Sequence, residues 1–87
     1  RLPIPQLTEE RRKELVKVVR HLAEEGRVAV RNVRRDCMHH LKELVKEGDV
    51  GDDEERRAEE RAQKLTDEHV AKIDEILKRK EEEIMEV

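Results

Sequence analysis

The sequence predicts an all-α fold, in which two long antiparallel helices belong to a three-helix bundle. Charged residues make up 49% of the 87 residues and aromatic residues 0%, so a core can hold only aliphatic and other small apolar side chains. The apolar residues recur every three or four positions, which is the period of an amphipathic helix. Disorder is the alternative for so polar a chain, and this regular period argues against it.

The chain is expected to form one partial helical-bundle domain over residues 1–87. Residues 1–8 are predicted to be an extended lead-in, because Pro3 and Pro5 fix φ and remove backbone donors. Thr8 is a good N-cap for a first long helix over residues 9–47. Gly48 is a natural stop for that helix.

The segment 48–52 is predicted to be a short turn, and a second long helix follows over residues 53–86. A short connection between two long helices indicates an antiparallel hairpin. Gly26 lies within the first helix, where glycine costs about 1 kcal/mol relative to alanine. Either close packing against a neighbouring helix or a local bend would explain it.

Each predicted helix carries an apolar stripe. The first stripe consists of Leu15, Val19, Leu22, Ala29, Val33, Cys37, Leu41 and Leu44, and Val16, Val30, Met38 and Val45 widen it. The second consists of Ala58, Ala62, Leu65, Ile73, Ile76 and Ile84, widened by Leu77, with His69 expected as a half-buried packing residue. Widened stripes indicate more than one neighbour for each helix, so we expect a third helix or a partner beside these two.

The first helix also carries a basic ridge, which includes the stretch RVAVRNVRRD. With Val33 set at zero, its cations fall between about 100° and 200° on the helical wheel, and Glu24 is the one acidic residue there. The ridge consists of Lys13, Lys17, Arg20, Arg27, Arg31, Arg34, Arg35 and Lys42. This arc predicts that the ridge faces away from the core. The part of the chain that contains the ridge is basic, because residues 1–48 carry 12 basic and 8 acidic residues. Residues 49–87 carry 8 basic and 15 acidic residues and are acidic.

The ridge is either a solvated helix face or a binding surface for phosphate. A solvated face usually interleaves charges of both signs, because opposite charges at i,i+4 stabilise a helix. Arginine presents a rigid, permanently charged fork of donors that suits phosphate. Phosphate contact is therefore favoured. Without aromatic residues base stacking is excluded, and recognition of structured RNA through its backbone is the expected mode.

The sequence predicts no catalytic residue, no metal site, no cofactor and no small-molecule substrate, so we expect no enzyme. His39 and His40 are adjacent and point about 100° apart on a helix, so they cannot chelate one ion. Cys37 is expected to be a small core hydrophobe. No signal peptide or membrane span is expected, and the single cysteine agrees with a cytoplasmic location. The chain begins at Arg1 and is expected to be a piece of a longer protein.

Three long motifs then indicate a family: LTEERRKEL, VAVRNVRRD and QKLTD. With them, the whole chain resembles the C-terminal part of bacterial ribosome recycling factors. The resemblance implies an L-shaped protein with a three-helix bundle and a small β domain. In that scheme this chain supplies the second and third bundle helices, and the first bundle helix and the β domain are absent from it.

The resemblance also implies a function in protein biosynthesis after translation termination. Such a factor binds ribosomal RNA of the large ribosomal subunit and, with elongation factor G, disassembles the post-termination ribosome. It implies RNA contacts by Arg31, Arg34 and Arg35, with Arg34 the strongest candidate, and the ridge adds Arg20 and Arg27. The alternative function is that of a helix–helix scaffold fragment that dimerises through its exposed apolar stripe.

Overall fold

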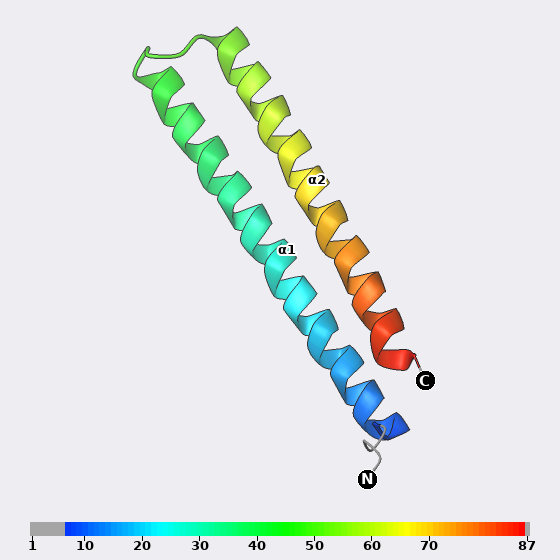
Figure 1. Cartoon of the computed structure of the whole chain (residues 1–87). Helices are drawn as coiled ribbons and strands as arrows, with labels where there is room; N and C mark the ends of the chain where they lie inside the picture. Colours follow the sequence, from blue (N-terminus) through cyan, green and yellow to red (C-terminus); the bar gives the residue numbers. More distant parts are fainter. Residues whose placement is uncertain (1–6, 87) are drawn as a thin grey trace, which may run out of the picture.

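The chain folds into a long, narrow helical hairpin. A computed structural model describes residues 7–86, so positions 1–6 of the lead-in predicted at 1–8 lie outside the described residues. Helix α1 spans Glu9–Lys46 and helix α2 spans Asp52–Met85, and the two run antiparallel side by side (Figure 1). The molecule measures 71 × 20 × 15 Å. The predicted all-α fold with two long antiparallel helices is confirmed.

The start of α1 is capped as its sequence predicts. Thr8 has extended backbone angles, and its side-chain oxygen accepts a hydrogen bond of 3.0 Å from the backbone N–H of Arg11. Glu9 and Glu10 lie in the first turn, where negative charge is favoured by the exposed N–H groups. The helix was expected over 9–47 and ends at Lys46.

The turn between the helices depends on Gly48, whose φ of 83° lies in the left-handed region. The backbone N–H of Gly48 donates to the carbonyl of Val45, and that of Asp49 donates to the carbonyl of Leu44, each at 3.0 Å. This pair of bonds is the Schellman motif, which satisfies the last carbonyls of a helix. Helix α2 begins one residue earlier than expected, and its N-cap Gly51 makes no side-chain cap bond.

Each helix contacts the other along one side, and we call this line of contact the seam. The less exposed residues recur at steps of three and four, as a helix–helix seam requires. On α1 they are Arg12, Leu15, Val16, Val19, Ala23, Gly26, Arg27, Val30, Arg34, Met38, Leu41 and Val45. On α2 they are Glu55, Ala58, Glu59, Ala62, Thr66, Val70, Ile73, Leu77, Glu81 and Ile84. Among residues 7–86 only Thr66 is buried, with 8% of its surface exposed, and its hydroxyl donates to the carbonyl of Ala62.

The seam is rotated relative to the predicted first stripe. Leu22 and Val33, which were expected in the core, are 58% and 69% exposed, and Cys37 is exposed rather than packed in a core. A single neighbour can cover only part of a wide apolar arc. Helix α2 covers the flank that contains Val16 and Val30 and leaves the other flank open.

Gly26 lies where the helices approach each other closely. A Cβ atom on Gly26 would lie 3.3 Å from Cδ1 of Ile73 on α2. That separation is tighter than an ordinary van der Waals contact. Of the two explanations that the sequence left open, close packing is therefore the one that the structure favours.

Candidate nucleic-acid interface

The basic ridge lies beside the seam between the helices, and its cations fall into two groups. Arg20, Arg27 and Arg34 reach across to polar side chains of α2. Arg31 and Arg35 are exposed on the outer side of α1. The expectation that the whole ridge faces away from the core was therefore wrong for the first group. The physical reason is the rotation of the seam, which brings one edge of the ridge against α2.

The arginines of the first group and three carboxylates of α2 follow the same heptad spacing. On α1 the arginines stand seven residues apart, and on α2 the carboxylates of Asp67, Asp74 and Glu81 do the same. Because the helices are antiparallel, Arg20 pairs with Glu81 at 2.9 Å and Arg27 pairs with Asp74. Charged residues flanking the seam of two packed helices commonly form such pairs and fix the register.

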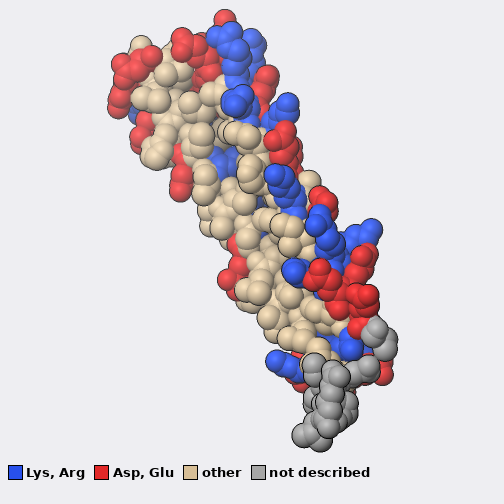
Figure 2. Space-filling view, in the orientation of Figure 1, with Lys and Arg blue, Asp and Glu red and all other residues tan. Residues whose placement is uncertain are grey.

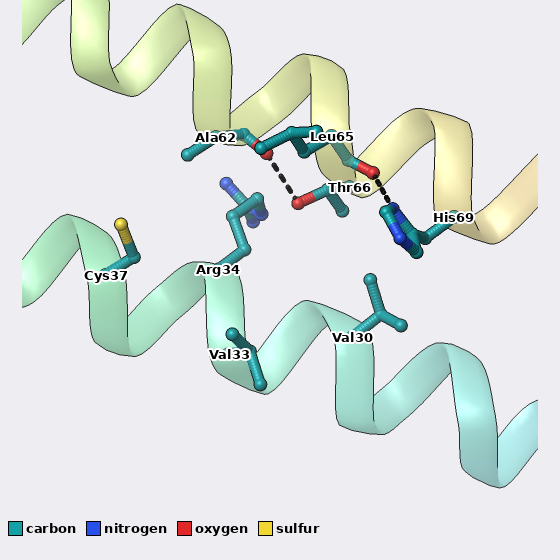
Figure 3. A pocket seen from close by; sticks show the side chains of 8 residues that line it. All are labelled: Val30, Val33, Arg34, Cys37, Ala62, Leu65, Thr66 and His69. Atoms are coloured by element: carbon teal, nitrogen blue, oxygen red, sulfur yellow. Dashed lines mark hydrogen bonds between the residues drawn. The ribbon is translucent and has the colours of Figure 1, made fainter.

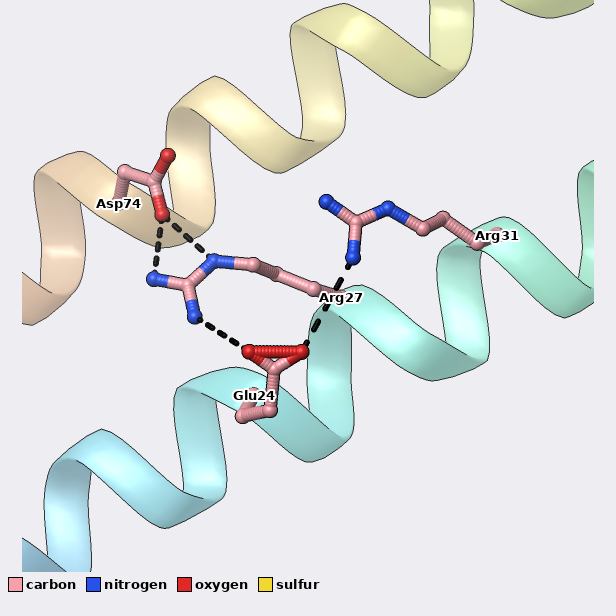
Figure 4. A network of polar contacts seen from close by, with 4 residues as sticks. All are labelled: Glu24, Arg27, Arg31 and Asp74. Atoms are coloured by element: carbon pink, nitrogen blue, oxygen red, sulfur yellow. Dashed lines mark hydrogen bonds and ion pairs between the residues drawn. The ribbon is translucent and has the colours of Figure 1, made fainter.

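Arg27 is largely enclosed, with 18% of its side chain exposed. Its Nε donates to Asp74 Oδ1 at 2.7 Å, and its Nη1 donates to Glu24 Oε2 at 3.3 Å (Figure 4). The other oxygen of Glu24 lies 3.9 Å from Nη1 of Arg31. Arg27 is therefore held by two carboxylates, whereas Arg31 has one distant carboxylate and 51% of its side chain exposed.

The carboxylates of α2 raise the pKa of two ridge arginines. The hydrogen bond and then the charge of Glu81 raise the pKa of Arg20, and the hydrogen bond from Asp74 is the main cause of the raised pKa of Arg27. A pKa raised on folding means that the charged guanidinium stabilises the fold below its unfolded pKa, and this contribution is lost as the pH rises through its folded pKa. Both guanidinium groups therefore stay charged at every physiological pH.

Arg34 lies in the middle of the seam and contacts a neutral side chain. Its Nη1 donates to Oε1 of Gln63 at 3.2 Å. The amide nitrogen of Gln63 in turn donates to Oδ1 of Asp67 at 2.9 Å. The carboxylate of Asp67 thus reaches Arg34 through an amide, and the hydrogen-bonded partner of Arg34 carries no charge.

Arg35 and the lysines complete the outer side of the ridge. Within the part of the chain that the structure describes, Arg35 makes no hydrogen bond or ion pair. A shallow polar hollow beside it is lined by Arg34, Arg35 and Lys42 from α1 and by Glu59, Glu60 and Gln63 from α2. A second hollow extends toward Arg31 and Asp74 and also includes Arg34. Among the ridge arginines, Arg31, Arg34 and Arg35 are therefore the three that make no direct ion pair with a carboxylate of α2.

An apolar groove runs along the seam on another side. Figure 2 shows a band of uncharged side chains along much of one face of the rod. The groove has one stretch lined by Val30, Val33, Arg34, Cys37, Ala62, Leu65, Thr66 and His69 (Figure 3). The other stretch is lined by Val19, Leu22, Ala23, Ile73, Ile76, Leu77 and Lys80. Its walls are exposed apolar side chains from both helices, as widened stripes predict.

His69 is exposed rather than half-buried, and its Nδ1 lies 2.7 Å from the carbonyl oxygen of Leu65. A carbonyl oxygen can only accept, so Nδ1 carries the proton in this contact. His39 lies 2.9 Å from Glu43 on its own helix and does not converge with other metal ligands. Across residues 7–86 no group of three metal-ligating side chains comes together. Neither α1 nor α2 has an apolar stretch that could span a lipid bilayer.

The sequence alone did not indicate which ridge arginines are neutralised. The partners Gln63, Asp74 and Glu81 lie on the other helix, far away in the chain. For Asp74 and Glu81 the signal is the common heptad spacing of acids on one helix and arginines on the other, whereas Gln63 lies outside that spacing. That spacing becomes informative only when the antiparallel register is known.

Fold and ridge together define a rigid helical hairpin with a cationic edge. The family model described as ribosome recycling factor matches residues 1–85 of the chain. The chain is 63% identical over all 87 residues to the ribosome-recycling factor of Rubrobacter xylanophilus, and 58% identical to those of Legionella pneumophila and Neisseria gonorrhoeae. The chain therefore belongs to the ribosome recycling factor family. It spans about half the length, 47%, of each of these three relatives.

Proposed function

We propose that this chain is the helical docking part of a factor that recycles ribosomes after termination of protein synthesis. In this proposal Arg31, Arg34 and Arg35 of the basic ridge bind ribosomal RNA of the large subunit. With elongation factor G, the complete factor then helps to disassemble the post-termination ribosome in the cytoplasm. Family membership supports the recycling role, and the ridge supports the contact with RNA.

The observation that carries the RNA contact is the concentration of available guanidinium charge around Arg31, Arg34 and Arg35. Arg31 is half exposed with one carboxylate at 3.9 Å, and Arg34 contacts an amide. Arg35 is exposed. Basic side chains that neutralise phosphates release counterions, which supplies affinity without reading the bases. With no aromatic side chain in the chain, contact through the RNA backbone is the mode that its residues can support.

The proposed role involves no bond chemistry by this chain. Two long helices packed along a common seam form a strut 71 Å long. A strut of this kind can dock at one place and transmit force that a partner applies at another. Arg20 and Arg27 then serve the strut itself, because their carboxylate partners tie α1 to α2.

The apolar groove is proposed to receive a third helix from the rest of the polypeptide. Val33, Leu22 and Ile76 are 69%, 58% and 54% exposed in this chain. Contiguous apolar surface of this kind is normally covered. A second copy of the chain is the other occupant, as the scaffold alternative supposes. Sedimentation of the full-length protein separates the two, because a monomer at high concentration excludes the scaffold.

Binding of the full-length protein to large ribosomal subunits over a salt series tests the RNA contact. The logarithm of the affinity should fall linearly with the logarithm of the salt concentration. Arg34→Ala should weaken binding and reduce the slope by roughly one, as removal of a phosphate contact does for nucleic acids generally. A salt-insensitive affinity that Arg34→Ala leaves unchanged would refute the proposal.

A further inference from the structure

We propose that Gln63 is a positioning residue that holds Arg34 in place while leaving its charge available for an RNA phosphate. This inference rests on the proposed function. Three ridge arginines occupy equivalent heptad positions along the seam, but their hydrogen-bond partners on α2 differ in charge. Arg20 and Arg27 meet carboxylates, whereas Arg34 meets the amide of Gln63.

The orientation of the Gln63 amide follows from its two neighbours. Its nitrogen donates to Asp67 at 2.9 Å, and its oxygen accepts from Arg34 at 3.2 Å. The reverse orientation would place the amide NH₂ against a guanidinium that only donates, and the amide oxygen against a carboxylate that only accepts. Asp67 therefore fixes the amide so that its oxygen faces Arg34.

The amide also separates Arg34 from a carboxylate that stands at the equivalent heptad position. Asp67 lies seven residues before Asp74, which pairs directly with Arg27. At Arg34 the carboxylate is engaged by Gln63, so the guanidinium is anchored by one donor to a neutral oxygen. A guanidinium has five donors. The N–H donors of Arg34 that do not bond to Gln63 can bond to a phosphate, because phosphate oxygens match the planar fork of the guanidinium.

The position of Arg34 suits such a ligand. It borders both hollows of the seam. One is also lined by Arg35, Lys42, Glu59 and Glu60, and the other by Arg31, Asp67 and Asp74. A phosphodiester there would meet arginines from successive turns of one stiff helix. Gln63 thus distinguishes a docking arginine from two arginines that stabilise the hairpin.

Gln63→Glu in the full-length protein tests this role, with affinity for large ribosomal subunits measured over a salt series. The new carboxylate should pair with Arg34 as Asp74 pairs with Arg27. Affinity should fall about tenfold, the range of a lost hydrogen bond to a charged group, and the salt slope should fall by roughly one. Gln63→Met removes the hydrogen bond that positions Arg34 but adds no charge, so it should weaken binding less than Gln63→Glu does and leave the salt slope nearly unchanged.

A double variant shows whether the effect acts through Arg34. In an Arg34→Gln background, Gln63→Glu should cause no further loss, because the group it neutralises is gone.

The outcomes separate the inference from the proposed function. If Arg34→Gln weakens salt-dependent binding but Gln63→Glu binds like the unmodified protein, the role of Gln63 is overturned. An equal loss from Gln63→Glu with and without Arg34 also overturns it. If binding is insensitive to both salt and Arg34→Gln, the RNA contact itself is refuted.

Discussion

At the scale of single residues, neighbouring arginines of the same ridge serve different purposes because of their partners. Arg27 is enclosed and held by Asp74 and Glu24, while Arg31, one turn further on, is half exposed. The helical wheel of the sequence placed Arg27 and Arg31 in one basic arc. It could not show which edge of that arc meets α2, because that depends on the position of the second helix.

Gly26 gives a residue-scale prediction. Alanine in a helix is favoured over glycine by about 1 kcal/mol, but its Cβ would press against Cδ1 of Ile73 at 3.3 Å. Gly26→Ala should therefore stabilise the full-length protein by less than that amount. In an Ile73→Val background, which lacks Cδ1, the same change should recover most of the gain. Denaturant unfolding measures both effects, and equal effects in the two backgrounds would contradict close packing at this site.

At the scale of the elements, the helix ends were largely predictable because capping depends on local residue types. Thr8 and Gly48 mark the start and the end of α1 by their own chemistry. The rotation of the seam was not predictable from the same sequence. The apolar arc of α1 is wider than one partner can cover, so either flank could have faced α2.

The two glycines of the turn give an element-scale prediction. Gly48→Ala should lower the free energy of unfolding by about 1 kcal/mol, because an L-residue is strained at a φ of 83°. Gly51 has extended angles, and an added Cβ would meet nothing within 4 Å. Gly51→Ser should therefore raise the free energy of unfolding by a few tenths of a kcal/mol, through a new N-cap bond. Opposite signs in denaturant unfolding are expected, and two equal losses would contradict this account of the turn.

At the scale of the whole molecule, the hairpin combines a cationic edge with an apolar groove. The groove accounts for the exposure of residues that the sequence placed in a core, such as Val33 and Leu22. The sequence indicated that a further neighbour was needed, because the stripes were too wide for two helices. It could not indicate which residues that neighbour would cover.

Two valines test whether the groove is covered in the full-length protein. Val33 lines the groove, whereas Val28 is 46% exposed and lies about 140° around α1 from it. Val33→Ser should destabilise the full-length protein by about 2 kcal/mol, the worth of burying such a side chain. Val28→Ser should change its stability by less than about 0.5 kcal/mol. Equal effects in thermal or denaturant unfolding would show that nothing covers the groove at Val33.

In our proposal Arg31, Arg34 and Arg35 of the basic ridge dock the factor on the ribosome. Splitting of post-termination ribosomes by the full-length protein with elongation factor G and GTP, followed by light scattering, tests it most directly. The triple variant Arg31→Gln, Arg34→Gln, Arg35→Gln should lose splitting activity. Lowering the salt concentration should recover part of that activity. The matched variant Arg56→Gln, Arg57→Gln, Arg61→Gln removes the same charge from α2 and should split ribosomes normally. Equal splitting by the two variants would contradict the claim.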